Sequence, residues 1–131
     1  MQAEIPRDAV VIRFRPIRDD AVLASAVKEY RRAGHYRVSV FADAARQGES
    51  FEAVEARLLE ASELAQLDPA ANNRYFTCTA GQLLDRGFTF WKDDEPGELA
   101  EHYSIDLGER PTLDDVSRFV GAFGPARRRP A

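Results

Sequence analysis

Three residues with catalytic side-chain types fall at alternate positions of one predicted strand. His102, Ser104 and Asp106 carry the functional groups of a hydrolase triad. Alternate residues of a strand lie about 6.6 Å apart, which is too far for the direct hydrogen bonds that a nucleophile and its base require. The spacing therefore favours an ordinary polar sheet face. It leaves His102 as the residue that could act with groups from elsewhere in the chain.

The single cysteine, Cys78, is the other candidate nucleophile. It would pair with His102 if the strands that carry the two residues were neighbours. Cys78 alternates in phase with Phe76, however, and free cysteine is among the most buried residue types, so we expect it in the core. A small hydrolase or toxin-like enzyme remains the alternative to a binding function; its candidate catalytic residues are His102, Cys78, Ser104 and Asp106.

The sequence carries no strong metal or cofactor motif, and we expect neither group. One cysteine and no His-x-x-x-His pair argue against a structural zinc site. The acidic run 92–98 offers oxygen ligands for Mg²⁺ or Ca²⁺ but lacks the ligand spacing of an EF-hand loop. We interpret its Asp93, Asp94 and Glu95 as a solvated turn that can dock a basic partner.

Basic residues gather on the predicted outer side of two strands and on one helix. They are Arg13, Arg15 and Arg37 on the strands, and Lys28, Arg31 and Arg32 on the helix. These residues can simply keep the protein soluble as surface charge. As a functional site, they would dock an acidic protein surface. With exposed aromatic residues such as Phe41 or Trp91, the strand arginines Arg13, Arg15 and Arg37 would suit an RNA- or DNA-binding module. The net charge of −4 and the pI near 5.2 argue against nucleic acid.

The charge changes sign along the chain. Residues 1–46 carry a net charge of +3, residues 47–126 carry −10, and the last five residues carry +3. Such separation lets a molecule dock charged partners or copies of itself. The sequence therefore predicts an accessory, adaptor or regulatory protein that acts by protein–protein binding through separated basic and acidic surfaces. A homodimer is one form of that binding.

Composition limits the class of protein further. A chain of 131 residues with 44% apolar residues suits one domain spanning residues 1–131. No apolar run approaches the roughly 20 residues needed to span a bilayer. The N-terminus has neither the charged start nor the apolar stretch of a signal peptide, and a single cysteine allows no internal disulfide. We therefore expect a cytoplasmic protein, and the preference for Arg and Ala is typical of a GC-rich bacterial genome.

Hydrophobic periodicity and cap residues predict the elements that position these candidates. Strands are expected at 10–15, 36–42, 74–79, 88–91 and 102–107, with helices at about 19–33, 51–66, 80–85 and 113–123. The apolar stripe of the last helix is Leu113, Val116, Phe119, Val120 and Phe123. Flexible tails are expected at about 1–8 and 125–131.

The order is strand–helix–strand–helix–strand–helix–strand–strand–helix. It predicts an α/β or α+β fold with a single mixed sheet of about five strands packed with about four helices. The link between the first two strands is long enough for a parallel crossover.

Overall fold

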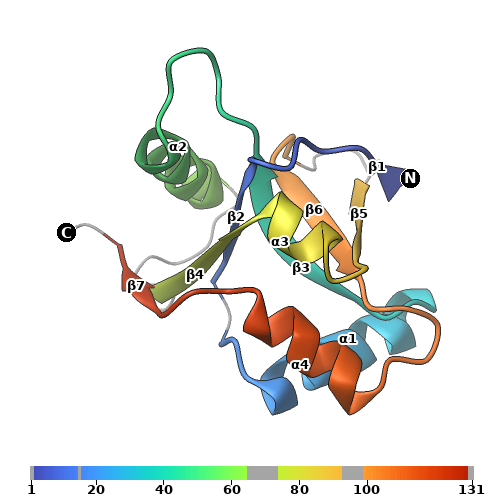
Figure 1. Ribbon diagram of the computed structural model, residues 1–131. Helices are drawn as coiled ribbons and strands as arrows, with labels where there is room; N and C mark the ends of the chain where they lie inside the picture. Colours follow the sequence, from blue (N-terminus) through green and yellow to red (C-terminus); the bar gives the residue numbers. More distant parts are fainter. Residues whose placement is uncertain (1, 15, 65–73, 93–98, 130–131) are drawn as a thin grey trace.

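The computed structural model describes residues 2–14, 16–64, 74–92 and 99–129. Within these residues, seven strands form one antiparallel sheet in the order β1-β5-β6-β3-β2-β4-β7. The strands are β1 (Gln2–Ala3), β2 (Val10–Arg13), β3 (Arg37–Asp43), β4 (Arg74–Thr79), β5 (Thr89–Lys92), β6 (His102–Asp106) and β7 (Arg127–Arg128) (Figure 1). The helices are α1 (Asp19–Ala33), α2 (Phe51–Leu64), α3 (Ala80–Leu84) and α4 (Leu113–Gly121).

The fold is α+β, and its sheet is antiparallel rather than mixed. The predicted parallel crossover between the first two strands is wrong, because β3 runs antiparallel beside β2. Helix α1 lies below the sheet with α4 in Figure 1. It connects the end of β2 to the start of β3 at the same end of the sheet, so the two strands run in opposite directions. The predicted strand count of about five is also too low. The two additional strands are two-residue edge strands, which are too short to show any periodicity in the sequence.

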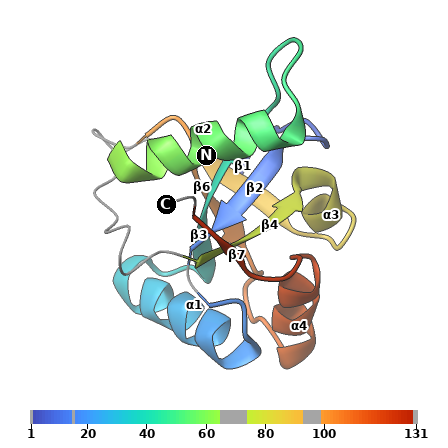
Figure 2. The same cartoon turned by 90° about the vertical axis from the view of Figure 1, so that its left-hand side faces the viewer.

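Helices cover both faces of the sheet. Figure 2 shows α2 on one side and α1 with α4 on the other. The larger core lies under α1, α3 and α4, and it includes Val11, Val40 and Phe119. The smaller core lies under α2, where Val54 and Leu58 pack against the opposite face of the sheet. The sheet is therefore the middle layer of the molecule.

Strand β2 lies between β3 and β4 and is buried on both of its faces. Val11 belongs to the larger core, while Val10 and Ile12 belong to the smaller one. Arg13 was expected to point to solvent, and this expectation is wrong. A strand covered by helices on both faces has no outward side, so alternation does not indicate exposure there.

Three predicted helix caps are confirmed, whereas α1 begins after Arg18, which makes no side-chain cap bond. Gly34 ends α1 with a φ of 83°, a backbone conformation that glycine adopts without steric cost. Thr79 and Thr112 each form a capping box at the start of α3 and α4. The apolar stripe of α4 needs one correction, because Leu113 is 68% exposed while Val116 and Phe119 are buried.

The segments expected as tails contact the sheet at both ends of the chain. Strand β1 pairs with β5, and Arg7 forms an ion pair with Asp85 at 2.7 Å. Strand β7 pairs with β4, where Arg127 lies 3.2 Å from the carboxylate of Glu55 on α2. Both ion pairs join a basic end of the chain to its acidic middle part.

Candidate functional site: a basic hollow between α1 and β3

A hollow of about 360 Å³ lies between α1 and the first half of β3. Four basic residues from three elements line it: Arg13, Lys28, Arg32 and Arg37. The rest of its described wall consists of Ser25, Glu29, Val38 and Ser39. The structure thus brings together four of the six basic residues that the sequence singled out.

One stripe of α1 forms the helical wall of the hollow. Ser25, Lys28, Glu29 and Arg32 follow the spacing i, i+3, i+4 and i+7, which places them on one face of a helix. Another stripe, containing Val22 and Ala26, is buried in the larger core. The amphipathic pattern that packs α1 therefore also presents its basic residues to the hollow.

Arg13 forms the inner end of the hollow. It is the last residue of β2 and is only 2% exposed. Its guanidinium donates hydrogen bonds to the Ser39 carbonyl oxygen at 2.6 Å and to Ser25 Oγ at 3.4 Å. Because a guanidinium is not deprotonated in proteins, these contacts fix a permanent positive charge between both walls.

Glu29 offsets part of the positive charge. Arg32 donates two hydrogen bonds to its carboxylate, at 2.6 and 3.0 Å, and His35 Nε2 lies 3.2 Å from the same carboxylate. The hydrogen bond from Arg32 is the main reason that the pKa of Glu29 lies below its ordinary value. Glu29 is therefore ionised at neutral pH and orients Arg32 along the helix.

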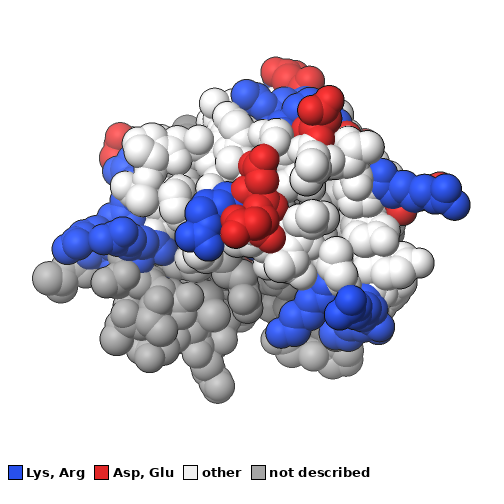
Figure 3. All heavy atoms as spheres, turned by 90° about the horizontal axis from the view of Figure 1, so that it is seen from below, with Lys and Arg blue, Asp and Glu red and all other residues white. Residues whose placement is uncertain are grey.

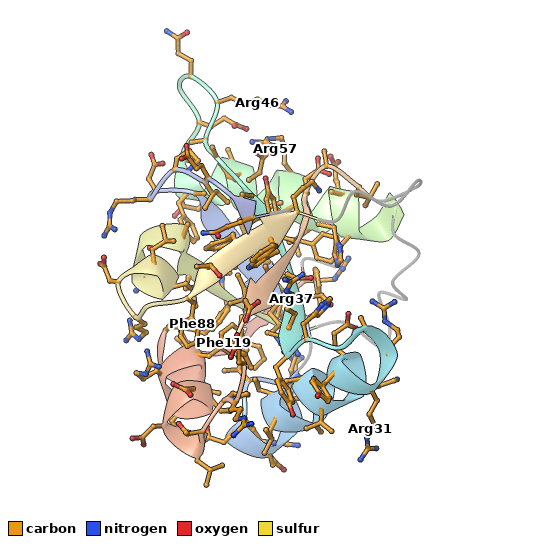
Figure 4. All side chains as sticks on the ribbon, turned by 90° about the vertical axis from the view of Figure 1, so that its right-hand side faces the viewer. Arg31, Arg37, Arg46, Arg57, Phe88 and Phe119 are labelled. Atoms are coloured by element: carbon orange, nitrogen blue, oxygen red, sulfur yellow. The ribbon has the colours of Figure 1, made fainter. Side chains whose placement is uncertain are left out.

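Arg37 links the hollow to the neighbouring face of the sheet. Its Nε donates to Asp106 at 3.1 Å, and its guanidinium lies 4.0 Å from the centre of the Trp91 ring. Figure 4 shows Arg37 beside the strands, between α1 and the upper half of the molecule. With Glu29 and Asp106 set against the four basic residues, the site keeps a net charge of +2.

Arg31, also predicted as a binding residue, is not part of the described wall of this hollow. Arg31 lies on α1 but points away from the sheet into solvent (Figure 4). Arg15, Asp93, Asp94 and Glu95 lie outside the described residues.

His102, Ser104 and Asp106 do share one face of β6, as the alternation predicted. They face Phe41, Ser39 and Arg37 of β3, in that order. The two carboxylate oxygens of Asp106 accept hydrogen bonds from Arg37 and from the Gly108 N–H, at 3.1 and 2.7 Å. The His102 ring lies edge-on to Phe41, with ring centres 5.6 Å apart. Asp106 thus accepts a hydrogen bond from Arg37 of the basic hollow and not from an imidazole.

Cys78 and His102 are far apart in the fold. Cys78 lies on β4 and His102 on β6, with β2 and β3 between them. Three strand spacings of about 4.8 Å separate the two strands by roughly 14 Å. Cys78 faces the larger core, whereas His102 contacts Phe41 of the smaller core on the other face. The geometry does not bring the two residues together.

The surface offers little of the aromatic platform that a nucleic-acid module would use. Phe41 was expected at the surface but is 8% exposed, because α2 covers it. Trp91 is partly buried and stacks on Arg37. Figure 3 shows small groups of charged residues on the face seen from below, with uncharged surface between the groups; in the middle and at the top of the view, basic and acidic residues lie side by side.

Three polar contributors to the hollow were not singled out from the sequence: Ser25, Glu29 and Ser39. The first two follow the helical spacing of Lys28 and Arg32, so the pattern contains a signal for them. Ser39 could not be found this way, because its role depends on which strand lies next to β3 and where that strand ends.

No family model, curated protein or solved structure matches the chain. Among the described residues, no helix is long and apolar enough to cross a membrane. In the same part of the chain, His, Cys, Asp and Glu residues form no group of three that could hold a metal ion. The case for a site therefore rests on the geometry of the hollow.

Proposed function

We propose that the protein acts by binding, and that the basic hollow receives an acidic segment of a partner protein. One observation carries this proposal: four basic residues from β2, α1 and β3 line a single hollow of about 360 Å³. We propose an accessory, adaptor or regulatory role; what favours the bacterial cytoplasm is the composition of the sequence, not the hollow. No catalytic step is part of it.

The basic residues would contribute in different ways. Arg13 is buried and already oriented by Ser39 and Ser25, so little side-chain entropy is lost when an anion approaches it. Lys28 is exposed on the rim, where it acts as a point charge on a flexible stem. Arg32 is held by Glu29 and contributes a planar guanidinium on the same face of α1. A carboxylate entering the hollow would meet the fixed guanidinium of Arg13 at the inner end and the flexible side chain of Lys28 at the rim.

A protein partner fits this site better than bulk nucleic acid. The whole chain carries a net charge of −4, which repels a polyanion at long range. A short acidic segment meets only the local positive charge. A second copy of the chain also presents exposed acidic residues, including Glu52 and Glu60 on α2, so self-association is another form of the same proposal.

The test compares two charge reversals on one helix. Lys28→Glu places a negative charge on the rim of the hollow, whereas Arg31→Glu makes the same change on the side of α1 that points away (Figure 4). The probe is a fluorescein-labelled hexaglutamate peptide, and binding is followed by anisotropy in 150 mM salt, where charges are screened beyond about 8 Å. We expect Lys28→Glu to weaken binding up to about tenfold, because the reversal removes one exposed attraction and adds one repulsion, each of about 1 kcal/mol or less.

Arg31→Glu should bind the peptide nearly as well as the unmodified chain. Equal losses for both variants would show that only the overall charge matters, and the hollow would not be the site. Absence of any peptide binding to the unmodified protein would also contradict the proposal. Melting curves of both variants confirm that the comparison is made between folded proteins.

A further inference from the structure

Strand β3 is longer than the neighbour that pairs with it on the side of the hollow. It pairs with β6 from Arg37 to Phe41, but with β2 only from Phe41 to Asp43. Within the described residues, positions 37–40 therefore have a strand on one side only. This open edge forms a wall of the basic hollow, through Arg37, Val38 and Ser39.

The direction of the backbone groups along this edge follows from the ladder. Leu107 N–H donates to the Tyr36 carbonyl at 2.9 Å, and Ala42 N–H donates to the Glu101 carbonyl at 2.8 Å. Even-numbered residues of β3 thus point their backbone groups toward the β6 side. Because these groups alternate along a strand, those of Arg37 and Ser39 point into the hollow.

The side chain of Arg13 confirms this direction. Its guanidinium donates to the Ser39 carbonyl at 2.6 Å, on the side of β3 where β2 pairs. An arginine side chain has donors but no acceptor, so it cannot accept hydrogen bonds from the backbone N–H groups of the same edge. Ser39 is an exposed residue, and it lines the hollow.

We propose that the acidic segment binds in an extended conformation and adds a short strand to this open edge of β3. The inference rests on the proposed function and specifies the conformation of its partner. The partner's backbone would accept from the N–H of Ser39 and exchange hydrogen bonds with Arg37. Addition of a strand to a sheet edge is a common mode of peptide recognition, in which the main chain supplies affinity and alternate side chains supply specificity.

The spacing of the basic residues predicts the pattern of the segment. Lys28 and Arg32 are four residues apart on α1, so their Cβ atoms lie about 6 Å from each other. Residues i and i+2 of an extended peptide are about 6.6 Å apart and point to the same side. Two acidic residues separated by one residue would therefore face Lys28 and Arg32 together. We infer a recognised pattern in which acidic and neutral residues alternate.

The test uses a capped hexapeptide of alternating Glu and Ser, and two forms of it that are N-methylated at every second backbone nitrogen. One form carries the methyl groups on the Glu residues and the other on the Ser residues. Alternate N–H groups of a strand point to opposite sides, so only one form should lose affinity, by roughly tenfold for each lost hydrogen bond. The other form should bind like the unmodified peptide.

A matched pair of protein variants tests the other side of the contact. Ser39→Pro removes the N–H that points into the hollow, while the neighbours Val38 and Val40 keep the ladder to β6. Proline is accepted where a strand N–H faces away from the ladder. Ser39→Ala keeps the N–H and controls for the hydroxyl. We expect at least a tenfold loss of peptide binding in Ser39→Pro and none in Ser39→Ala.

The outcomes separate this inference from the proposed function. If Lys28→Glu weakens binding but Ser39→Pro and both methylated peptides bind normally, the hollow binds acidic groups without strand addition, and the inference is wrong. If Lys28→Glu has no effect, the proposed function itself fails. Tighter binding of a single-stranded oligonucleotide than of the peptide would assign the hollow to nucleic acid and overturn both. Should Ser39→Pro fail to fold, the methylated peptides still decide the question.

Discussion

Cys78 lies on β4 with its side chain in the larger core, and its thiol is shielded by that position. The residue is 4% exposed, and burial raises the pKa of its thiol to about 12. The nearby Arg86 acts in the opposite direction but is the smaller influence. A thiol with this pKa is almost wholly protonated at neutral pH, and the protonated form is a poor nucleophile.

We predict that Cys78 reacts slowly with thiol reagents in the folded protein. Labelling at pH 7.5 should become fast only in denaturant, where the thiol reaches the solvent. His102→Ala should leave the labelling rate unchanged, because the two residues lie on strands that are not neighbours. Rapid labelling of the native protein that slowed in His102→Ala would restore the Cys–His hypothesis.

Arg57 holds the loop that projects between β3 and α2 in Figure 1. It donates two hydrogen bonds of 2.8 Å to Glu49 and lies 2.6 Å from the carboxylate of Asp43 at the other end of the loop. The hydrogen bonds from Arg57 to Glu49, followed by one from the Arg46 N–H, lower the pKa of Glu49 from 4.5 to about 2. The loop thus depends on an ionised carboxylate.

Acid should therefore weaken this loop over a defined pH range. A carboxylate with a lower pKa in the folded state stabilises the fold above its unfolded pKa, here near 4.5, and loses that contribution as the pH falls toward 2. We expect Glu49→Gln to lower the melting temperature at pH 7 and to match the unmodified chain near pH 2. Glu109 supplies the control, since it is exposed and lies outside the helices and strands, and Glu109→Gln should behave like the unmodified chain at both pH values. A constant difference between pH 7 and pH 2 for Glu49→Gln would contradict the mechanism.

At the scale of the elements, α4 provides a test of core packing. Phe119 is fully buried, and its ring lies 5.9 Å from that of Phe88 in an edge-on arrangement. Figure 4 shows the two labelled side chains next to each other. Leu113 lies on the same helix but is 68% exposed. The helix thus carries a buried and an exposed apolar residue that can be compared directly.

We predict that Phe119→Ala lowers the free energy of unfolding by about 3–5 kcal/mol, as the removal of a buried aromatic ring typically does. That loss is a large part of the stability of a small domain. Leu113→Ala should change the free energy by less than about 0.5 kcal/mol, because it removes little buried surface. Chemical denaturation measures both. A small effect of Phe119→Ala would show that α4 is peripheral to the fold.

Elements with a strong local signal were predictable from the sequence. Capping boxes at Thr79 and Thr112, and the glycine after α1, depend only on neighbouring residues. Strand order and direction depend instead on contacts between distant segments. The sequence therefore did not reveal that β2 is central, and the burial of Arg13 was missed for that reason.

The candidate site was predictable to a similar extent. The basic stripe of α1 can be read from helical spacing, and Arg37 was placed on the polar side of its strand. Sequence spacing cannot show that these residues converge on one hollow. It also cannot show that β2 ends before β3 does, which is the feature that opens the edge at Ser39. Both properties belong to the packing of the whole sheet.

Over the whole molecule, part of the charge separation along the chain is neutralised by folding. Arg7 pairs with Asp85, and Arg127 pairs with Glu55, which is 7% exposed. Arg129 donates to Ser62 on the same helix at 2.6 Å. The basic ends of the chain thus lie against its acidic middle part. The charge left for intermolecular contacts is concentrated at smaller sites such as the basic hollow.

Self-association through such sites should be weak and sensitive to salt. A head-to-tail contact would place an acidic surface of one copy, such as exposed Glu52 and Glu60 on α2, at the basic hollow of the next. Exposed ion pairs contribute about 1 kcal/mol or less each, and screening reduces this further. We therefore expect sedimentation velocity to show a larger mean sedimentation coefficient in 20 mM salt than in 500 mM salt at high protein concentration. Lys28→Glu should remove the difference, whereas Arg31→Glu should preserve most of it. A monomer at both salt concentrations would exclude charge-driven assembly and leave the hollow to a different acidic partner.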